Sequence, residues 1–133
     1  MTPYALMLQA CGLSIREAAA FHGVREDTVK SWSSGRAWDG HPDGPLRELR
    51  ALHDRIATAA EAALALIEAR PDAAEIEIGY PADDHEARAL GFPCVGAWRA
   101  MAAQVVAELG RPVTLVPRGS TPATAGAADA HGR

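Results

Sequence analysis

Apolar residues recur at helical spacing along most of the chain, and short stretches with glycine, proline or polar residues divide them into segments. The pattern predicts four helices, over residues 3–11, 14–21, 26–33 and 45–69. Ser14 and Glu17 have the spacing of a capping box, in which each side chain accepts a hydrogen bond from the other residue's backbone N–H. The glycines placed to end the first three helices, by adopting the left-handed conformation common there, are Gly12, Gly23 and Gly35.

The second half of the chain has a different pattern. Polar and apolar residues alternate over 75–80, and residues 113–116 form a short run rich in β-branched residues, so two strands are predicted. Between them, we expect a short helical segment over 85–90 and a longer helix over 96–109. The segments expected to lack regular structure are a loop over 37–44 and a disordered tail over 118–133, which is rich in Gly, Ala, Thr and Pro.

These elements predict a mainly α fold with three ordered parts. Residues 1–56 are expected to form an N-terminal helix-turn-helix domain, residues 57–71 the connecting part of a long helix, and residues 72–117 a small α/β C-terminal dimerisation unit. We expect the dimer on physical grounds. A two-stranded sheet is marginal alone, and pairing with the same sheet of a second copy would cover its edges.

Composition and charge narrow the classes of function. The chain has 133 residues, with 13 basic and 17 acidic side chains and a formal net charge of −4, which argues against a protein that coats nucleic acid regardless of sequence. The cysteines, Cys11 and Cys94, lack the spacing of a metal site, and Cys11 is expected to fill a gap in the core. No targeting signal or membrane-spanning run is recognisable, so we expect a soluble cytoplasmic protein without a metal or other cofactor.

The strongest functional signal lies in residues 13–36. The small residue Ala18 would let two helices approach closely, and Gly23 would make the turn between them. The residues expected to anchor the second helix are Val24, Val29 and Trp32. This arrangement is typical of a helix-turn-helix unit, in which the N-terminal end of the second helix meets base edges in the major groove of DNA. The sequence LSIREAAAFHGVREDTVKSWSSGR resembles that of the lambda-repressor/Cro class of helix-turn-helix domains, without a gap.

This resemblance implies roles for the polar residues around the second helix. The residues expected to face bases are Glu26, Asp27, Lys30 and Ser31, of which Lys30 could reach a phosphate instead. Those expected near phosphates are Arg16, Arg25, Thr28 and Arg36. Arg25 stands where the class commonly has a capping serine, so the chain departs from the pattern at the start of this helix.

Glu26 and Asp27 are acids at a surface that would meet a polyanion, and two interpretations are open. In the first turn of a helix, carboxylates interact favourably with the positive end of the helix dipole. This interpretation explains the two acids without any contact to DNA. Alternatively, carboxylates accept hydrogen bonds from cytosine N4 in the major groove. In that case they would select sequence, because an unpaired carboxylate near phosphates is costly.

A second resemblance extends over roughly residues 3–117. The order of helix-turn-helix, long fourth helix and then VGAWRAMAAQVVAELGRPVTLV is similar to that of the YdiL-like regulators and the related anti-CRISPR-associated autorepressors. It implies a homodimer that binds an inverted-repeat DNA operator and represses its own gene. The expected dimer core consists of Ile76, Ile78, Trp98, Met101, Val105 and Leu115, with Tyr80 and Phe92 beside them.

Other functions stay open from the sequence. The main alternative is an antitoxin-like or adaptor module that binds a partner protein and does not read DNA. RNA binding is disfavoured because the sequence has no aromatic stacking platform. An enzyme is not expected. The best candidate for a nucleophile with a base consists of Cys94, His85 and Asp84, and nothing in the sequence orients these side chains for catalysis.

Overall fold

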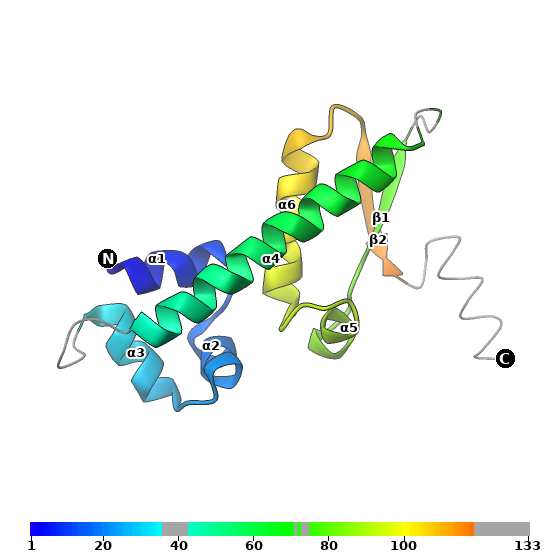
Figure 1. Ribbon diagram of the computed structural model, residues 1–133. Coiled ribbons are helices and arrows are strands. Elements are labelled where there is room, and N and C mark those ends of the chain that lie inside the picture. Colours follow the sequence, from blue (N-terminus) through cyan, green and yellow to red (C-terminus); the bar gives the residue numbers. More distant parts are fainter. Residues whose placement is uncertain (36–42, 71, 73–74, 119–133) are drawn as a thin grey trace, which may run out of the picture.

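Helices dominate the fold, and two short strands form a small sheet near the C-terminal end (Figure 1). The computed structural model describes residues 1–35, 43–70, 72 and 75–118. Within them the elements are α1 (Pro3–Ala10), α2 (Ile15–His22), α3 (Glu26–Ser34), α4 (Asp43–Glu68), β1 (Ile76–Tyr80), α5 (Asp84–Ala89), α6 (Val95–Glu108) and β2 (Val113–Pro117). The predicted mainly α fold with a small α/β unit is therefore confirmed.

The long helix α4 is the axis around which the other elements are arranged. Figure 1 shows α1, α2 and α3 around its first half, and α6 and the sheet beside its second half. One side of α4 is apolar at helical spacing, and its buried residues are Leu49, Leu52, Ile56 and Ala60. This stripe packs against α1 at one end and α6 at the other. The apolar second half of α4 thus has a partner within the same chain.

Local signals in the sequence explain where the N-terminal helices begin. The Thr2 side chain caps α1 by accepting a hydrogen bond from the backbone N–H of Ala5 at 3.0 Å. At the start of α2, the Ser14 backbone N–H donates to Glu17 Oε1 at 2.8 Å, and the Glu17 N–H donates to Ser14 Oγ at 3.1 Å. The predicted capping box is confirmed.

The sheet consists of two parallel strands. Ile76 is paired with Val113 and Tyr80 with Pro117, so the chain returns from one end of β1 to the start of β2 through α5 and α6. Because side chains alternate along a strand, this register places Ile78, Tyr80 and Leu115 on the same face of the sheet. That face is buried near Ile76 and exposed at Tyr80 and Leu115.

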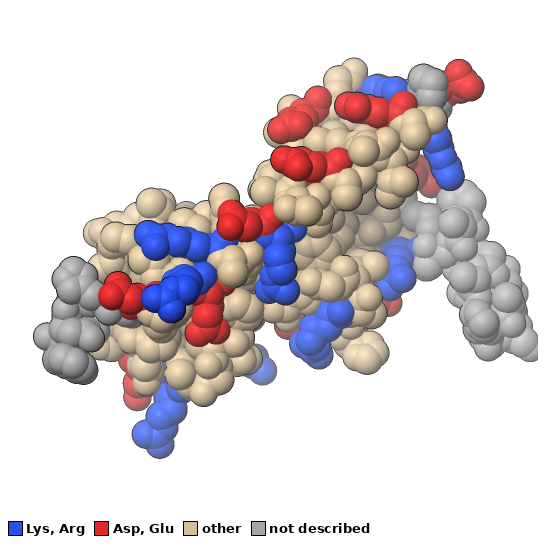
Figure 2. All heavy atoms as spheres, viewed as in Figure 1, with Lys and Arg blue, Asp and Glu red and all other residues tan. Residues whose placement is uncertain are grey.

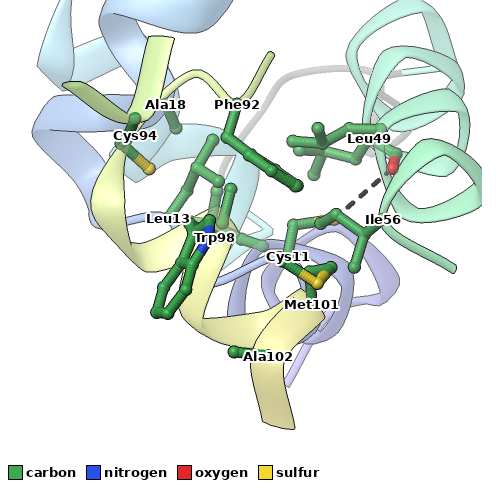
Figure 3. Close-up of a cluster of buried hydrophobic side chains, with 14 of the residues drawn as sticks. Cys11, Leu13, Ala18, Leu49, Ile56, Phe92, Cys94, Trp98, Met101 and Ala102 are labelled. Carbon is green, nitrogen blue, oxygen red and sulfur yellow. Dashed lines mark hydrogen bonds between the residues drawn. The ribbon is translucent and has the colours of Figure 1, made fainter. Parts of the chain in front are cut away.

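The buried side chains form one cluster that extends from α1 to α6. Figure 3 shows residues from both halves of the sequence interleaved, with Phe92 beside Leu49. Cys11 fills a fully buried position, as expected, and its thiol donates to the carbonyl oxygen of Leu49 at 3.4 Å. The sequence boundaries expected at residues 56 and 72 therefore do not coincide with a break in the core.

The predicted dimer core differs from the packing within the chain. The structure buries Ile76, Trp98, Met101 and Val105 in a single chain, and Phe92 joins them. These side chains are covered within one chain, and their role as dimer contacts stays a prediction. Of the remaining expected residues, Ile78 is half-buried, and Leu115 and Tyr80 are exposed. α4 packs on the apolar side of α6, for which the sequence had suggested a second copy of the chain.

Two glycines bring the N-terminal helices into direct backbone contact with α6. A Cβ atom at Gly12 would overlap the carbonyl group of Gly96, and a Cβ atom at Gly96 would overlap the carbonyl oxygen of Gly12. Gly12 also has φ +75°, in the left-handed region that favours glycine. Both positions therefore require a residue without a side chain.

Two predictions of irregular structure lie mostly outside the described residues. These are the loop over 37–44, of which only 43 and 44 are described, and the tail over 118–133, of which only Arg118 is described. In the part of the chain that is described, α4 begins at Asp43, two residues before the expected start. None of the helices described has both the length and the apolar character needed to cross a membrane.

Replacing Gly96 by alanine is expected to lower the free energy of unfolding by about 1–3 kcal/mol, because the added methyl group must displace backbone atoms. Gly110→Ala is a matched control, since Gly110 is exposed between α6 and β2, its φ lies outside the left-handed region, and a Cβ atom there meets nothing within 4 Å. That variant should gain about 0.4–1 kcal/mol. Urea unfolding followed by circular dichroism measures both, and equal effects would show that the Gly12–Gly96 contact does not constrain the fold.

Candidate nucleic-acid interface

Helices α2 and α3 meet at a tight glycine turn. Gly23 has φ +72°, and the backbone N–H groups of Gly23 and Val24 both donate to the carbonyl oxygen of Ala19. This pattern ends α2 and redirects the chain into α3. Ala18 and Ala19 are buried, and their small side chains allow the two helices to approach closely. The two helices and the glycine turn expected from the sequence are therefore present.

The inner face of α3 is held against α1. Val29 is completely buried, and Trp32 is half-buried against the core. The Thr2 hydroxyl lies 3.3 Å from the carbonyl oxygen of Trp32 and 3.0 Å from that of Ser33, and it donates to these groups. The last turn of α3 is thus tied to the start of α1, and Gly35, with φ +77°, ends the helix.

A cluster of aromatic side chains joins the four N-terminal helices. The His22 side chain is only 1% exposed, its Nε2 atom lies 3.0 Å from the Tyr4 hydroxyl, and its Nδ1 atom lies 3.5 Å from Glu48 Oε1. Trp32 packs with its ring centre 5.5 Å from those of both Tyr4 and His22. Contacts from α1, α2 and α4 therefore fix the position of α3.

Sequence reasoning missed this cluster. The predicted second helix ended at residue 21, so His22 had no expected contacts, and Tyr4 and Glu48 had no assigned role. Their contacts join residues 4, 22 and 48, which no local pattern relates. An amphipathic pattern could have indicated that Tyr4 is buried, since it falls on the same side of α1 as Leu8.

Burial raises the pKa values of one tyrosine and two cysteines in the core. It raises the pKa of Tyr4 to about 12, with a further contribution from the negative charge of Glu48. Burial also raises the pKa of the Cys11 thiol to about 11 and raises the pKa of the Cys94 thiol. Both thiols are therefore protonated near neutral pH and are poor nucleophiles.

The outer face of α3 is polar. Glu26, Asp27 and Lys30 are exposed, Thr28 and Ser31 are half-buried, and the preceding residue Arg25 is exposed. Arg25 occupies the N-cap position without a side-chain capping bond, which agrees with the departure from the class pattern noted in the sequence. Glu26 and Asp27 occupy the first turn, where the helix dipole favours negative charge.

The charged side chains of this surface are free to meet a ligand. None of them forms an ion pair with any of the described residues; they are Arg16, Arg25, Glu26, Asp27 and Lys30. Figure 2 shows Lys and Arg interspersed with Asp and Glu over the visible face of the molecule, without one continuous basic surface. Any affinity for DNA would therefore depend on a few cations around α3.

One predicted contact cannot be placed. Arg36, expected near a phosphate, lies outside the described residues, as do Trp38 and His41 in the following loop. Seven of the expected DNA-contacting residues lie on α2, on α3 or at the N-cap of α3, namely Arg16, Arg25, Glu26, Asp27, Thr28, Lys30 and Ser31.

The alternative nucleophile set does not have a reactive geometry. Cys94 is buried, and the Asp84 side chain accepts a hydrogen bond from the backbone N–H of Val95 at 2.9 Å, at the start of α6. Asp84 therefore has a structural role as a helix-capping group. Among the described residues, no three His, Cys, Asp or Glu side chains are grouped so as to hold a metal ion.

Comparison with known proteins does not add a relative. No protein-family model matches the chain, and no curated protein matches it.

Raising the pH above about 9 is expected to destabilise the fold. The pKa values of Tyr4 and Cys11 rise from 10.0 and 9.0 to about 12 and about 11, so both groups ionise more easily when the chain unfolds. Below about pH 9 both groups are largely neutral in the folded and the unfolded chain, and their full contribution to the free energy of unfolding is present. It falls as the pH rises towards the folded pKa values, by up to about 1.4 kcal/mol per pH unit for each group.

Urea unfolding at a series of alkaline pH values measures this fall. Tyr4→Phe removes one titrating group and should give a shallower decrease above about pH 10. An identical pH dependence in the variant and the parent chain would mean that Tyr4 does not contribute to the alkaline destabilisation.

Proposed function

We propose that this protein is a sequence-specific DNA-binding transcriptional regulator that presents α3 to the major groove. The observation that carries the proposal is the contrast between the two faces of α3. Its inner face is fixed by Val29, Trp32 and the contact with Thr2, whereas its outer face carries Glu26, Asp27 and Lys30, which form no ion pair with the described residues. A rigid helix with an unpaired polar face suits base reading, because little conformational entropy is lost on binding.

The distribution of charge supports selective DNA binding. Arg16, Arg25 and Lys30 supply positive charge around α3, and Glu26 and Asp27 supply negative charge in its first turn. Cations near phosphates provide affinity for any sequence, whereas a carboxylate in the groove is favourable only where a donor such as cytosine N4 faces it. We infer that the two acids lower non-specific affinity and contribute to sequence preference.

The regulator would act as a homodimer. Both strands of the β1–β2 sheet have one edge that is not paired within the sheet, and a two-stranded sheet gains most from added strands. Edge pairing between two copies needs none of the side chains already buried in the single-chain core. Two-fold symmetry then suits an inverted-repeat operator, with half-sites about 34 Å, or one helical turn, apart. Repression, including repression of its own gene, follows where the operator overlaps a promoter.

Lys30→Ala is expected to weaken binding to the preferred DNA sequence by about 10-fold, because an exposed cation on the outer face of α3 is lost. Selection from random DNA duplexes identifies that sequence, and electrophoretic mobility shift at several salt concentrations measures affinity. Arg70→Ala is the matched control: Arg70 is exposed beyond the far end of α4, and the variant changes the net charge equally. An equal loss in both variants would point to a general charge effect and would contradict reading by α3.

The same experiment tests the two acids. Asp27→Ala and Glu26→Ala should bind non-preferred duplexes more tightly than the parent chain and lose part of the discrimination between sequences. If each variant strengthened binding to all duplexes by the same factor, the acids would act only through general repulsion. Failure of the parent chain to bind any duplex in a salt-dependent way would favour a protein-interaction module instead.

Sedimentation at about 10 μM is expected to give a mass near twice the 14.0 kDa of one chain. The physical reason is that edge pairing covers unpaired backbone groups of the sheet. The sedimentation should be repeated with and without operator DNA, since DNA can bring two monomers together. A monomer in the absence of DNA would contradict a preformed dimer and, with it, the simplest origin of a symmetric operator.

A further inference from the structure

A large groove runs along α6 on the side that does not pack in the core. Its volume is about 1350 Å³. Small residues of α6, Ala102, Ala103 and Ala107, form its floor. Ala103 and Ala107 are exposed on the face of the helix roughly opposite Met101 and Val105, whereas Ala102 is buried at the edge of the core.

The walls of the groove are apolar and exposed. Tyr80 is 37% exposed, Val106 43% and Leu115 49%. Tyr80 and Leu115 come from the same face of the sheet, as the strand register requires, and Val106 comes from α6. No described residue covers them, so water meets a continuous apolar surface where a partner would remove it from solvent.

The size of the groove suits a helix better than a small molecule. Small-molecule pockets commonly have volumes of about 300–1,000 Å³. A helix about 10 Å across rises about 1.5 Å per residue, so 1350 Å³ corresponds to about 11 residues of helix. Small residues on the floor would allow the backbone of such a helix to approach α6 closely.

One end of the groove is acidic. Glu17, Asp83 and Asp84 lie there, and each accepts a backbone hydrogen bond at the start of a helix, at 2.8, 2.9 and 2.9 Å. These bonds fix the carboxylates in position, and no described Lys or Arg forms an ion pair with them, including the neighbouring Arg99. A ligand with positive charge at this end would therefore meet preorganised acceptors.

We propose that the groove binds an amphipathic helix of another protein. The apolar stripe of that helix packs on Val106, Leu115 and Tyr80, and Lys or Arg side chains at one of its ends pair with the carboxylates of Glu17, Asp83 and Asp84. The proposal does not depend on DNA binding by α3. The groove also includes Gly12 and Gly96, so its occupant contacts the helix-turn-helix region and α6 at the same time.

A display library of 14-residue peptides, selected against the full-length chain, tests the proposal. We expect enrichment of peptides with apolar residues at helical spacing and Lys or Arg near one end. Ala103→Arg places a bulky charge on the exposed floor of the groove and should weaken their binding at least 10-fold. Ala51→Arg, at an exposed position of α4, is the matched control and should leave binding unchanged.

Asp83→Asn separates charge from capping, because asparagine caps a helix about as well as aspartate does. It should weaken the selected peptides by about 3- to 10-fold at low salt and by less at high salt. Asp72→Asn, at an exposed position between α4 and β1, should have no effect. Circular dichroism and thermal unfolding check that all variants are folded.

Several results would overturn the proposal. These are recovery of no peptide, recovery of peptides without helical spacing or basic residues, and binding that Ala103→Arg leaves unchanged. A fourth is a change from dimer to monomer in Ala103→Arg by sedimentation, which would assign the groove to a second copy of this chain. DNA binding measured in parallel reports on the proposed function of α3 and does not enter this outcome.

Discussion

The contact between the backbones of Gly12 and Gly96 is the constraint on which the arrangement of the two halves depends. It joins the turn between α1 and α2 to the first turn of α6, at a separation that leaves no room for a Cβ atom on either side. With these backbones in contact, α4 can pack on α1 and α6 at once, and the buried side chains form one cluster. The helix-turn-helix region and the sheet unit therefore share one core and are not separate domains joined only by a helix.

The position of α3 depends on a second set of contacts, which is polar as well as apolar. His22, although buried, lies between the Tyr4 hydroxyl and the Glu48 carboxylate, and Thr2 holds the end of α3. The hydrogen bonds of Tyr4 with His22 and of Thr2 with the end of α3 are directional, so they fix the orientation of α3 more closely than apolar packing alone would. Base reading in a groove requires this kind of orientation, because a donor or acceptor must meet its partner within a few tenths of an ångström.

Most elements could be predicted from the sequence because their signals are local. The capping box of Ser14 and Glu17, the glycine at position 23 and the alternating residues before Tyr80 each act within a few residues. The partners of Trp98, Met101 and Val105 could not be predicted, because helical spacing shows that a face is apolar and does not show what covers it. The Tyr4–His22–Glu48 cluster was missed for the same reason. The polar face of α3 was predictable, since the anchors Val29 and Trp32 fix which residues point outward.

The parallel pairing of β1 and β2 has a consequence for how the chain folds. Ile76 and Val113 are separated in the sequence by α5 and α6, so the two strands can pair only when the chain between them has folded back. During synthesis β2 is also the last described element to leave the ribosome. Contacts of this kind form slowly because the intervening loop must close first. The helices around α4 can therefore assemble early, while β1 waits with its apolar residues uncovered, which makes this strand the segment most exposed to aggregation or chaperone binding before the chain is complete.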